Sequence, residues 1–352
     1  MASSSPASSS PGSVSRAGPM LDVRDLAVTF TRRGRADFHA VDGVTFSVRA
    51  GETVGLVGES GCGKSVTSLA VMRLLPRRGV RITGEVLFEG RNLLSLGDDA
   101  MRDIRGRDIA MIFQDPMTSL NPVVPIGTQV AEVLERHRAM SRGEANAEAT
   151  TLLRRVGIPD AARRLKEYPH QLSGGMRQRG LIAMALACQP RLLIADEPTT
   201  ALDVTIQAQI LELLRELVSD LGTALVMITH DLGVVAGLCD TVNVMYAGRI
   251  VERAGRRDLF AHPRHQYTGG LLASIPRLDD PRGSRLRPIR GSSADTVPWS
   301  HGCAFIPRCD ASTQGCHRGD LELVPDDQRP DHLLRCVNPV PVAPAQPAEV
   351  GR

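Results

Sequence analysis

A glycine-rich loop between an apolar run and a helical stretch constrains this chain more than any other feature of its sequence. Residues 53–57 read Thr-Val-Gly-Leu-Val, and residues 58–65 read Gly-Glu-Ser-Gly-Cys-Gly-Lys-Ser, which fits the pattern G-x-x-x-x-G-K-[ST]. A strand, this loop and a helix in succession turn backbone N–H groups and a helix N-terminus toward one point, where phosphates can bind. The alternative is a glycine-rich turn that happens to precede a helix. The flanking strand and helix disfavour it.

The loop predicts a site for a nucleoside triphosphate, ATP in the first instance, and Mg²⁺. Lys64 is expected to hold the β and γ phosphates, and the Ser65 hydroxyl to ligate Mg²⁺. The other candidates for contact with the nucleotide lie in the loop and at the start of the helix: Gly58, Ser60, Gly61, Cys62, Gly63 and Val66.

A second apolar run ends in two carboxylates. Residues 192–197 read Leu-Leu-Ile-Ala-Asp-Glu, which is typical of a buried strand with acids at its end. Asp196 is expected to hold the magnesium shell, while Glu197 can reach the attacking water as a general base. Alone, such a pair would be interpreted as solvated loop acids, but after a phosphate loop it favours catalysis.

The composition excludes several classes of protein. The chain has 352 residues, enough for about two domains, and 42% of them are hydrophobic, so wholesale disorder is excluded. A net charge of +3 and an aromatic content of 3% disfavour nucleic acid as a partner. No apolar run reaches the roughly 18 to 20 residues of a membrane span, and the first twenty residues lack an apolar secretion segment. We therefore expect a cytoplasmic protein.

Apolar periodicity predicts an α/β fold with two sheets. Alternating apolar residues indicate a small antiparallel sheet with strands at 28–30, 44–48 and 82–88. Short apolar runs that lead into turns and helices indicate a buried parallel sheet with strands at 53–57, 192–195 and 224–229.

The pattern also divides the chain into segments. A core is expected at 20–260, with a helical insertion at about 115–174 whose main helices lie near 127–140 and 144–156. A small cysteine-bearing extension follows at 261–338. The ends, 1–19 and 339–352, are rich in small residues and proline and are predicted to be disordered.

Further motifs narrow the function. Leu-Ser-Gly-Gly-Met-Arg-Gln-Arg at 172–179 resembles the signature motif of ATP-binding cassette (ABC) proteins. Gln114 in Phe-Gln-Asp-Pro resembles the Q-loop glutamine of that family, Asp203 in Ala-Leu-Asp its D-loop, and His230 in Ile-Thr-His-Asp its switch histidine. With the phosphate loop and the acidic pair, these motifs occur in the order of the family. The resemblance implies an ABC-type P-loop ATPase core.

The resemblance also implies a composite site. In the family two cassettes pack head to tail, and each ATP lies between the phosphate loop of one and the signature of the other, here Ser173, Gly174, Gly175 and Gln178. Gln114 would contact Mg²⁺ and the water, His230 would hold the γ-phosphate, and Asp203 would lie at the nucleotide. The family places an aromatic residue against adenine, and Phe38 is the candidate here.

Longer strings point to a subfamily. Residues 113–122, Tyr-Pro-His-Gln at 168–171 and the stretch from 262 to 338 resemble ATPase subunits of oligopeptide and dipeptide importers, a subfamily that includes nickel importers. The resemblance implies an ATP-hydrolysing subunit at the cytoplasmic face of the membrane. Its implied partners are a second ATPase subunit, related or identical, two integral membrane permease subunits and, indirectly, an extracytoplasmic solute-binding protein. The alternatives are an importer of another solute, such as nickel, and a soluble ABC ATPase acting on ribosomes or DNA.

Four cysteines cluster near the end of the chain, at Cys303, Cys309, Cys316 and Cys336. Their spacing is not that of paired C-x-x-C ribbons, and four thiolates suit either Zn²⁺ or a four-iron four-sulfur cluster. Free buried thiols are the third possibility. The subfamily resemblance favours the iron–sulfur cluster. Three histidines lie near enough in sequence to act as substitute ligands: His301, His317 and His332.

Overall fold

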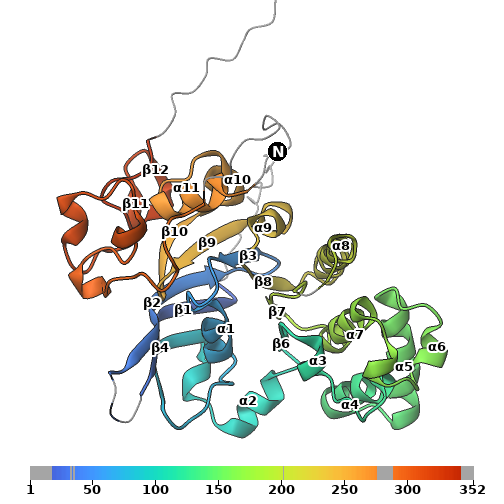
Figure 1. Cartoon of the computed structure of the whole chain (residues 1–352). Coiled ribbons are helices and arrows are strands. Elements are labelled where there is room, and N and C mark those ends of the chain that lie inside the picture. The colour runs from blue at the N-terminus through green and yellow to red at the C-terminus, as the bar shows by residue number, and fades with distance from the viewer. Residues whose placement is uncertain (1–17, 32–33, 35, 201, 276–287, 342–352) are drawn as a thin grey trace, which may run out of the picture.

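The computed structural model describes residues 18–31, 34, 36–200, 202–275 and 288–341. The predicted disordered ends therefore lie almost wholly outside the described residues. Two sheets organise the fold, one of four strands in the order β2-β1-β4-β5 and one of eight in the order β11-β12-β10-β9-β3-β8-β7-β6 (Figure 1). The segment boundaries at 20, 115, 174, 260 and 338 stay predictions.

The smaller sheet is antiparallel, as expected. Strand β1 (Leu21–Phe30) pairs with β2 (Phe38–Val48) on one side and with β4 (Val80–Phe88) on the other, and β5 (Arg91–Asn92) closes the edge. Alternate side chains of β1 and β2 are buried because one face of the sheet packs on the core that surrounds helix α1 (Lys64–Val71).

The larger sheet contains five parallel strands. They are, in spatial order, β9 (Thr241–Tyr246), β3 (Thr53–Val57), β8 (Ala224–Thr229), β7 (Leu192–Asp196) and β6 (Ile109–Ile112). Nearly every residue of these strands is buried, which explains their continuous apolar runs. The carboxyl ends of parallel strands meet at one edge, so β3, β7 and β8 deliver the phosphate loop, the acidic pair and His230 to the same place.

Several helices connect and cover these strands. Their bounds are α2 (Asp98–Ile104), α7 (Gly174–Leu186), α8 (Val204–Leu221) and α9 (Leu232–Leu238). Single turns of 3-10 helix occur at Leu93–Ser95, Pro169–Gln171, Trp299–His301, Ile306–Arg308 and Gln314–His317. Within the described residues, no helix has the length and apolar character needed to cross a membrane.

The helical insertion consists of α3 (Pro116–Ser119), α4 (Ile126–Arg138), α5 (Arg142–Arg155) and α6 (Ala161–Arg164). The first three pack with α7, and α6 packs with α5. Helices α4 and α5 lie within two residues of the predicted ranges at each end. Ser141 begins α5 with a capping box, in which its side chain and that of Glu144 satisfy each other's backbone N–H groups. Figure 1 shows the insertion, in green, on the opposite side of the molecule from the extension, in red and orange.

The C-terminal extension continues the large sheet. Strand β10 (Arg249–Gly255) is antiparallel to β9, β12 (Arg329–Leu334) is antiparallel to β10, and β11 (Val324–Asp326) pairs with β12. Helices α10 (Arg256–Ala261) and α11 (Gln266–Ala273) lie between β10 and β11 in the chain. Sheet pairing and buried side chains, such as Trp299 and Phe305, attach the extension to the core.

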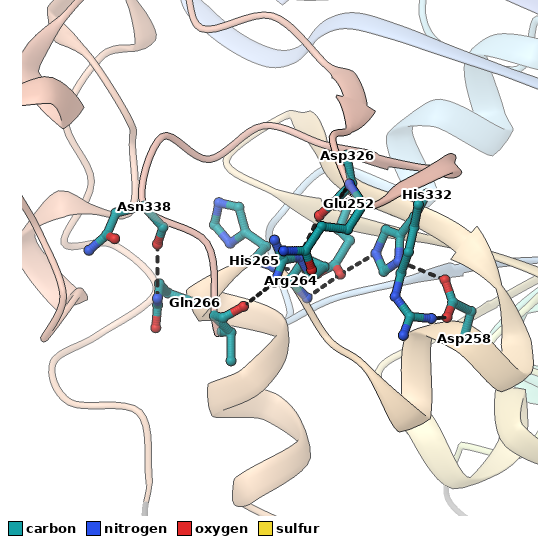
Figure 2. A network of polar contacts seen from close by, with 11 residues as sticks. Glu252, Asp258, Arg264, His265, Gln266, Asp326, His332 and Asn338 are labelled. Carbon is teal, nitrogen blue, oxygen red and sulfur yellow. Dashed lines mark hydrogen bonds and ion pairs between the residues drawn. The ribbon is translucent and has the colours of Figure 1, made fainter. Parts of the chain in front are cut away.

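A buried polar network strengthens this attachment (Figure 2). The Glu252 carboxylate, fully buried on β10, accepts hydrogen bonds from the backbone N–H groups of Arg264 (2.6 Å) and His265 (2.9 Å). His332 of β12 lies between Glu252 and Asp258, at 2.6 and 2.9 Å. Arg264 in turn pairs with Asp326 of β11. Each buried charge therefore has a partner, which is the condition for burying it at tolerable cost.

Candidate nucleotide site

The phosphate loop adopts a tight conformation that glycine permits. Gly58 and Gly63 have φ of 152° and 107°, and a Cβ there would lie 2.2 and 2.4 Å from the carbonyl oxygens of Met245 and Ala40. A side chain at either position would clash with backbone. The buried Lys64 ammonium donates hydrogen bonds to the carbonyl oxygens of Gly58 (2.8 Å) and Glu59 (3.1 Å). The loop therefore wraps around the ammonium group of Lys64.

The first residues of α1 face the end of β7. The Ser65 hydroxyl donates a hydrogen bond to Oδ1 of Asp196 at 3.0 Å. Burial raises the pKa of Asp196 above its usual value. A hydroxyl and a carboxylate oxygen at contact distance are donors that Mg²⁺ prefers, so these two residues fit the predicted metal.

Glu197 is the centre of a cluster of polar side chains. Its carboxylate accepts hydrogen bonds from Nε2 of Gln114 (2.9 Å) and from the Thr200 hydroxyl (3.0 Å), and Nδ1 of His230 lies 3.2 Å away. The backbone of Glu197 has φ of 46°, and its N–H donates to Ile228 of the next strand at 2.8 Å. The structure therefore brings together all three predicted catalytic residues, which are up to 116 positions apart (230 − 114). Thr200 is an addition that the sequence analysis missed.

The signature residues lie at a different place, beside the start of α8. Ser173 caps α7 by accepting a hydrogen bond from the N–H of Met176 at 3.3 Å. A Cβ on Gly175 would meet the side chain of Ile206 at 2.9 Å, so the glycine allows α7 and α8 to approach. Asp203 caps α8 through the N–H of Ile206 at 3.0 Å. Ala201 of the D-loop lies outside the described residues.

A cleft of about 760 Å³ opens beside the phosphate loop. Phe38, Ser60 and Gly61 line it from the core, and Trp299 and Asp320 line it from the extension. This volume lies within the range of pockets for small ligands. Phe38 is 49% exposed at the first position of β2, and the loop and this aromatic ring therefore share one concave surface.

Comparison with known families agrees with this geometry. Residues 41–200 match the family described as ABC transporter, and residues 251–316 match the C-terminal region of oligopeptide/dipeptide transporters. The oligopeptide transport ATP-binding protein OppD of Escherichia coli is 50% identical, over 92% of this chain and 95% of that protein. The chain belongs to the ATP-binding subunits of the peptide ABC transporter family. The predicted family is thus confirmed, and with it the class of activity, an ATPase coupled to transport.

Other relatives of this ABC ATPase support the assignment. The dipeptide transport ATP-binding protein DppD of Bacillus subtilis is 53% identical, over 85% of this chain and 89% of that protein. Among solved structures, the ATP-binding cassette MJ0796, described as a dimer in a post-hydrolysis state with ADP and Pi, superposes with a TM-score of 0.61. It is 30% identical and covers 68% of this chain and 99% of its own. The predicted ABC fold is confirmed.

Two of the predicted nucleotide contacts of this ABC ATPase have other surroundings. Gln178 is 1% exposed within α7, and its Nε2 atom has no hydrogen-bond partner among the described residues. A buried side chain on the inner face of a helix is not available to a ligand at the helix N-terminus. Asp203 serves as the cap of α8, and its nucleotide contact stays a prediction.

The four clustered cysteines of the extension line one small enclosed cavity of about 10 Å³, together with Phe305. Burial raises the pKa of Cys303 to about 12 and that of Cys336 to about 11. Among the residues that the structure describes, no group of three or more His, Cys, Asp or Glu side chains is placed to hold a metal ion. His332, predicted as a substitute ligand, is held in the network of Glu252 and Asp258 instead.

Proposed function

We propose that this ABC ATPase binds and hydrolyses MgATP to power the uptake of di- or oligopeptides. The observation that carries the ATPase assignment is the convergence of Gln114, Thr200 and His230 on Glu197. The solute class rests on the names of the relatives and on the match to the oligopeptide/dipeptide C-terminal region.

The site residues divide the chemistry among them. The phosphate loop and Lys64 bind the β and γ phosphates, and Ser65 with Asp196 holds Mg²⁺, which neutralises charge on the phosphate oxygens. Glu197 accepts the proton of the attacking water. Gln114 and His230, both within 3.2 Å of that carboxylate, orient it and place an amide and an imidazole near the γ-phosphate.

A second cassette completes the site. Ser173, Gly174 and Gly175 form an exposed or half-exposed helix N-terminus, which suits a γ-phosphate bound by another molecule. The dimeric state of the similar MJ0796 cassette supports this arrangement. The second cassette is either a related chain or a second copy of this one.

The helical insertion contacts the membrane permeases. Four large apolar residues are exposed on and around it by 38 to 77%: Phe113, Met117, Val123 and Tyr168. Phe113 directly precedes Gln114, whose side chain is hydrogen-bonded to Glu197. A permease helix that covers this surface would therefore contact the residue next to Gln114. The ATPase would then be peripheral, at the cytoplasmic face of the membrane, with two permease subunits and a solute-binding protein beyond them.

The four cysteines hold an iron–sulfur cluster in this proposal. A single tetrahedral Zn²⁺ with bonds of about 2.3 Å needs sulfurs about 3.8 Å apart, whereas a four-iron four-sulfur cluster takes thiolates that are more widely spaced. What supports the cluster is that the four thiols line one cavity, together with the resemblance of the extension to that of the importer subfamily. Protein purified without oxygen should contain iron and acid-labile sulfide, both reduced in Cys309→Ser. Stoichiometric zinc without iron would contradict the cluster.

The transport function is tested with the assembled importer in vesicles. Peptide-loaded binding protein should stimulate ATP hydrolysis and drive peptide uptake, and Lys64→Ala should abolish both by weakening MgATP binding. Stimulation by nickel-loaded binding protein but not by peptide would move the solute assignment to the nickel alternative. Association with ribosomes or DNA in place of a permease would support the soluble alternative.

A further inference from the structure

Every polar group of Glu59, the second residue of the phosphate loop, is bound. Its carbonyl oxygen accepts a hydrogen bond from Lys64 at 3.1 Å. Its backbone N–H donates to the hydroxyl of Tyr267 at 2.8 Å. Its carboxylate accepts two parallel hydrogen bonds from the Arg308 guanidinium, at 2.5 and 2.8 Å. Two of these three partners come from the chain after the core strands, more than 200 positions away.

Arg308 is held firmly on its own side. Its side chain is 2% exposed, and its Nε donates to the carbonyl oxygen of Arg290 at 3.0 Å. The guanidinium carbon lies 5.9 Å from the ring centres of both Tyr246 and Phe305. The hydrogen bonds with Glu59 raise the pKa of Arg308 above its ordinary value, so the guanidinium stays charged at physiological pH. Two parallel hydrogen bonds to a buried arginine that is held by neighbouring rings fix the position of the Glu59 carboxylate.

We propose that Arg308 is a positioning residue for ATP, which fixes the phosphate loop and, through Glu59, the direction of Lys64. A glycine-rich loop is flexible by composition, and its N–H groups bind phosphate well only when they are already oriented. Arg308 and Tyr267 supply that order from outside the loop. Arg308 thereby contributes to nucleotide binding through Glu59 and not through a contact with the nucleotide. This inference rests on the proposed ATP site.

The competing explanation is that the pair only anchors the extension. Arg264 and Asp326 offer a matched control, because they form a second arginine–carboxylate pair, with side chains 8% and 1% exposed, that anchors the same extension (Figure 2). Among the residues that the structure describes, the hydrogen bonds of this pair go to Glu252, Gln328 and Val340, and none reaches the phosphate loop. Arg264→Met should therefore lower the thermal midpoint without a matching effect on ATP at a temperature where the protein is folded.

The experiment measures MgATP binding to the full chain by calorimetry, with thermal midpoints recorded in parallel. Arg308→Met and Glu59→Gln should each raise the Kd for MgATP, Arg308→Met by about tenfold, within the usual range of coupling between two sites. The double variant should resemble Arg308→Met alone, because both changes break one contact. If Arg308→Met does not fold, Glu59→Gln and Tyr267→Phe carry the test from the other side of the contact.

Unchanged MgATP affinity in Glu59→Gln and Arg308→Met would overturn the proposal. An equal loss of affinity in Arg264→Met would also overturn it, since the effect would then follow stability alone. Lys64→Ala separates this outcome from failure of the proposed function. If Lys64→Ala binds MgATP normally, the ATP site itself is wrong, whereas a defect in Lys64→Ala alone leaves the site intact and removes only the role of Arg308.

Discussion

Two parts of the proposed nucleotide site differ in burial and in hydrogen bonding. They are the phosphate-loop half, which consists of residues 58–65 with Asp196 and Glu197, and the signature half, residues 173–175. In the phosphate-loop half, Lys64, Asp196 and Glu197 are less than 9% exposed and each is hydrogen-bonded to neighbours from other elements. In the signature half, Ser173 is exposed and its hydroxyl bonds only within its own helix start. The first half is preorganised by its own chain, and the second presents a helix N-terminus outward. The difference indicates that one nucleotide site is divided between two molecules.

The largest effect is expected at Glu197. Glu197→Gln should retain MgATP binding, because the phosphate loop and the magnesium ligands are unchanged, and turnover should fall about 10³-fold because an amide cannot accept the proton of water. A closed dimer should accumulate with ATP, visible by size-exclusion chromatography. Turnover within a few fold of the unchanged protein would assign the base to another residue.

The second prediction tests the signature half alone. Ser173→Asp keeps a good helix cap but puts a negative charge where a γ-phosphate from the partner would bind, so turnover should fall about 10²-fold. MgATP binding to the isolated chain should not change. Ser173→Asn is the matched control, because it caps the helix without charge, and its loss should be much smaller. If the Asp variant weakened binding in the monomer, the two halves would belong to one site in one chain.

Gln114 tests the link between Glu197 and the insertion. Gln114→Ala removes the hydrogen bond to the Glu197 carboxylate, and we expect turnover to fall about tenfold with little change in MgATP affinity. In the assembled importer the same variant should also lose part of its stimulation by peptide. A steady-state assay with and without loaded binding protein separates the two effects. A loss confined to MgATP affinity would contradict the role in coupling.

The smallest effect is expected at Phe38, at the outer rim of the phosphate-loop half. Phe38→Ala should raise the Kd for MgATP about fivefold by removing a stacking surface, whereas Phe38→Tyr should retain the affinity. Equal titrations with ATP and with inorganic triphosphate measure the base contribution directly. A matching loss for triphosphate would show that Phe38 acts on the loop and not on the base.

Local motifs made much of the site predictable. The phosphate loop, the acidic pair and the signature each occupy fewer than ten consecutive residues, and each performs its chemistry through backbone geometry that short sequence can specify. Gln114 and His230 were assigned by their order along the chain. The extension was less predictable, because its strands β11 and β12 are only three and six residues long, and β12 pairs with β10, which lies far earlier in the sequence. Pairing between short strands that are far apart in the sequence produces no periodic pattern of apolar residues in either of them.

The sequence by itself determined which residues are expected to bind phosphate and magnesium, because a loop of glycines before a lysine and a serine has few other uses. Only the tertiary structure decided that Gln178 faces inward, that Thr200 joins Glu197, and that Arg308 holds Glu59 from 249 positions away. These features depend on which face of a helix is buried and on which charged side chains, far apart in the sequence, form a buried ion pair. Arg308 is one of forty arginines, and the residues next to it in the sequence do not indicate that it pairs with Glu59. Only the folded chain brings the two side chains together.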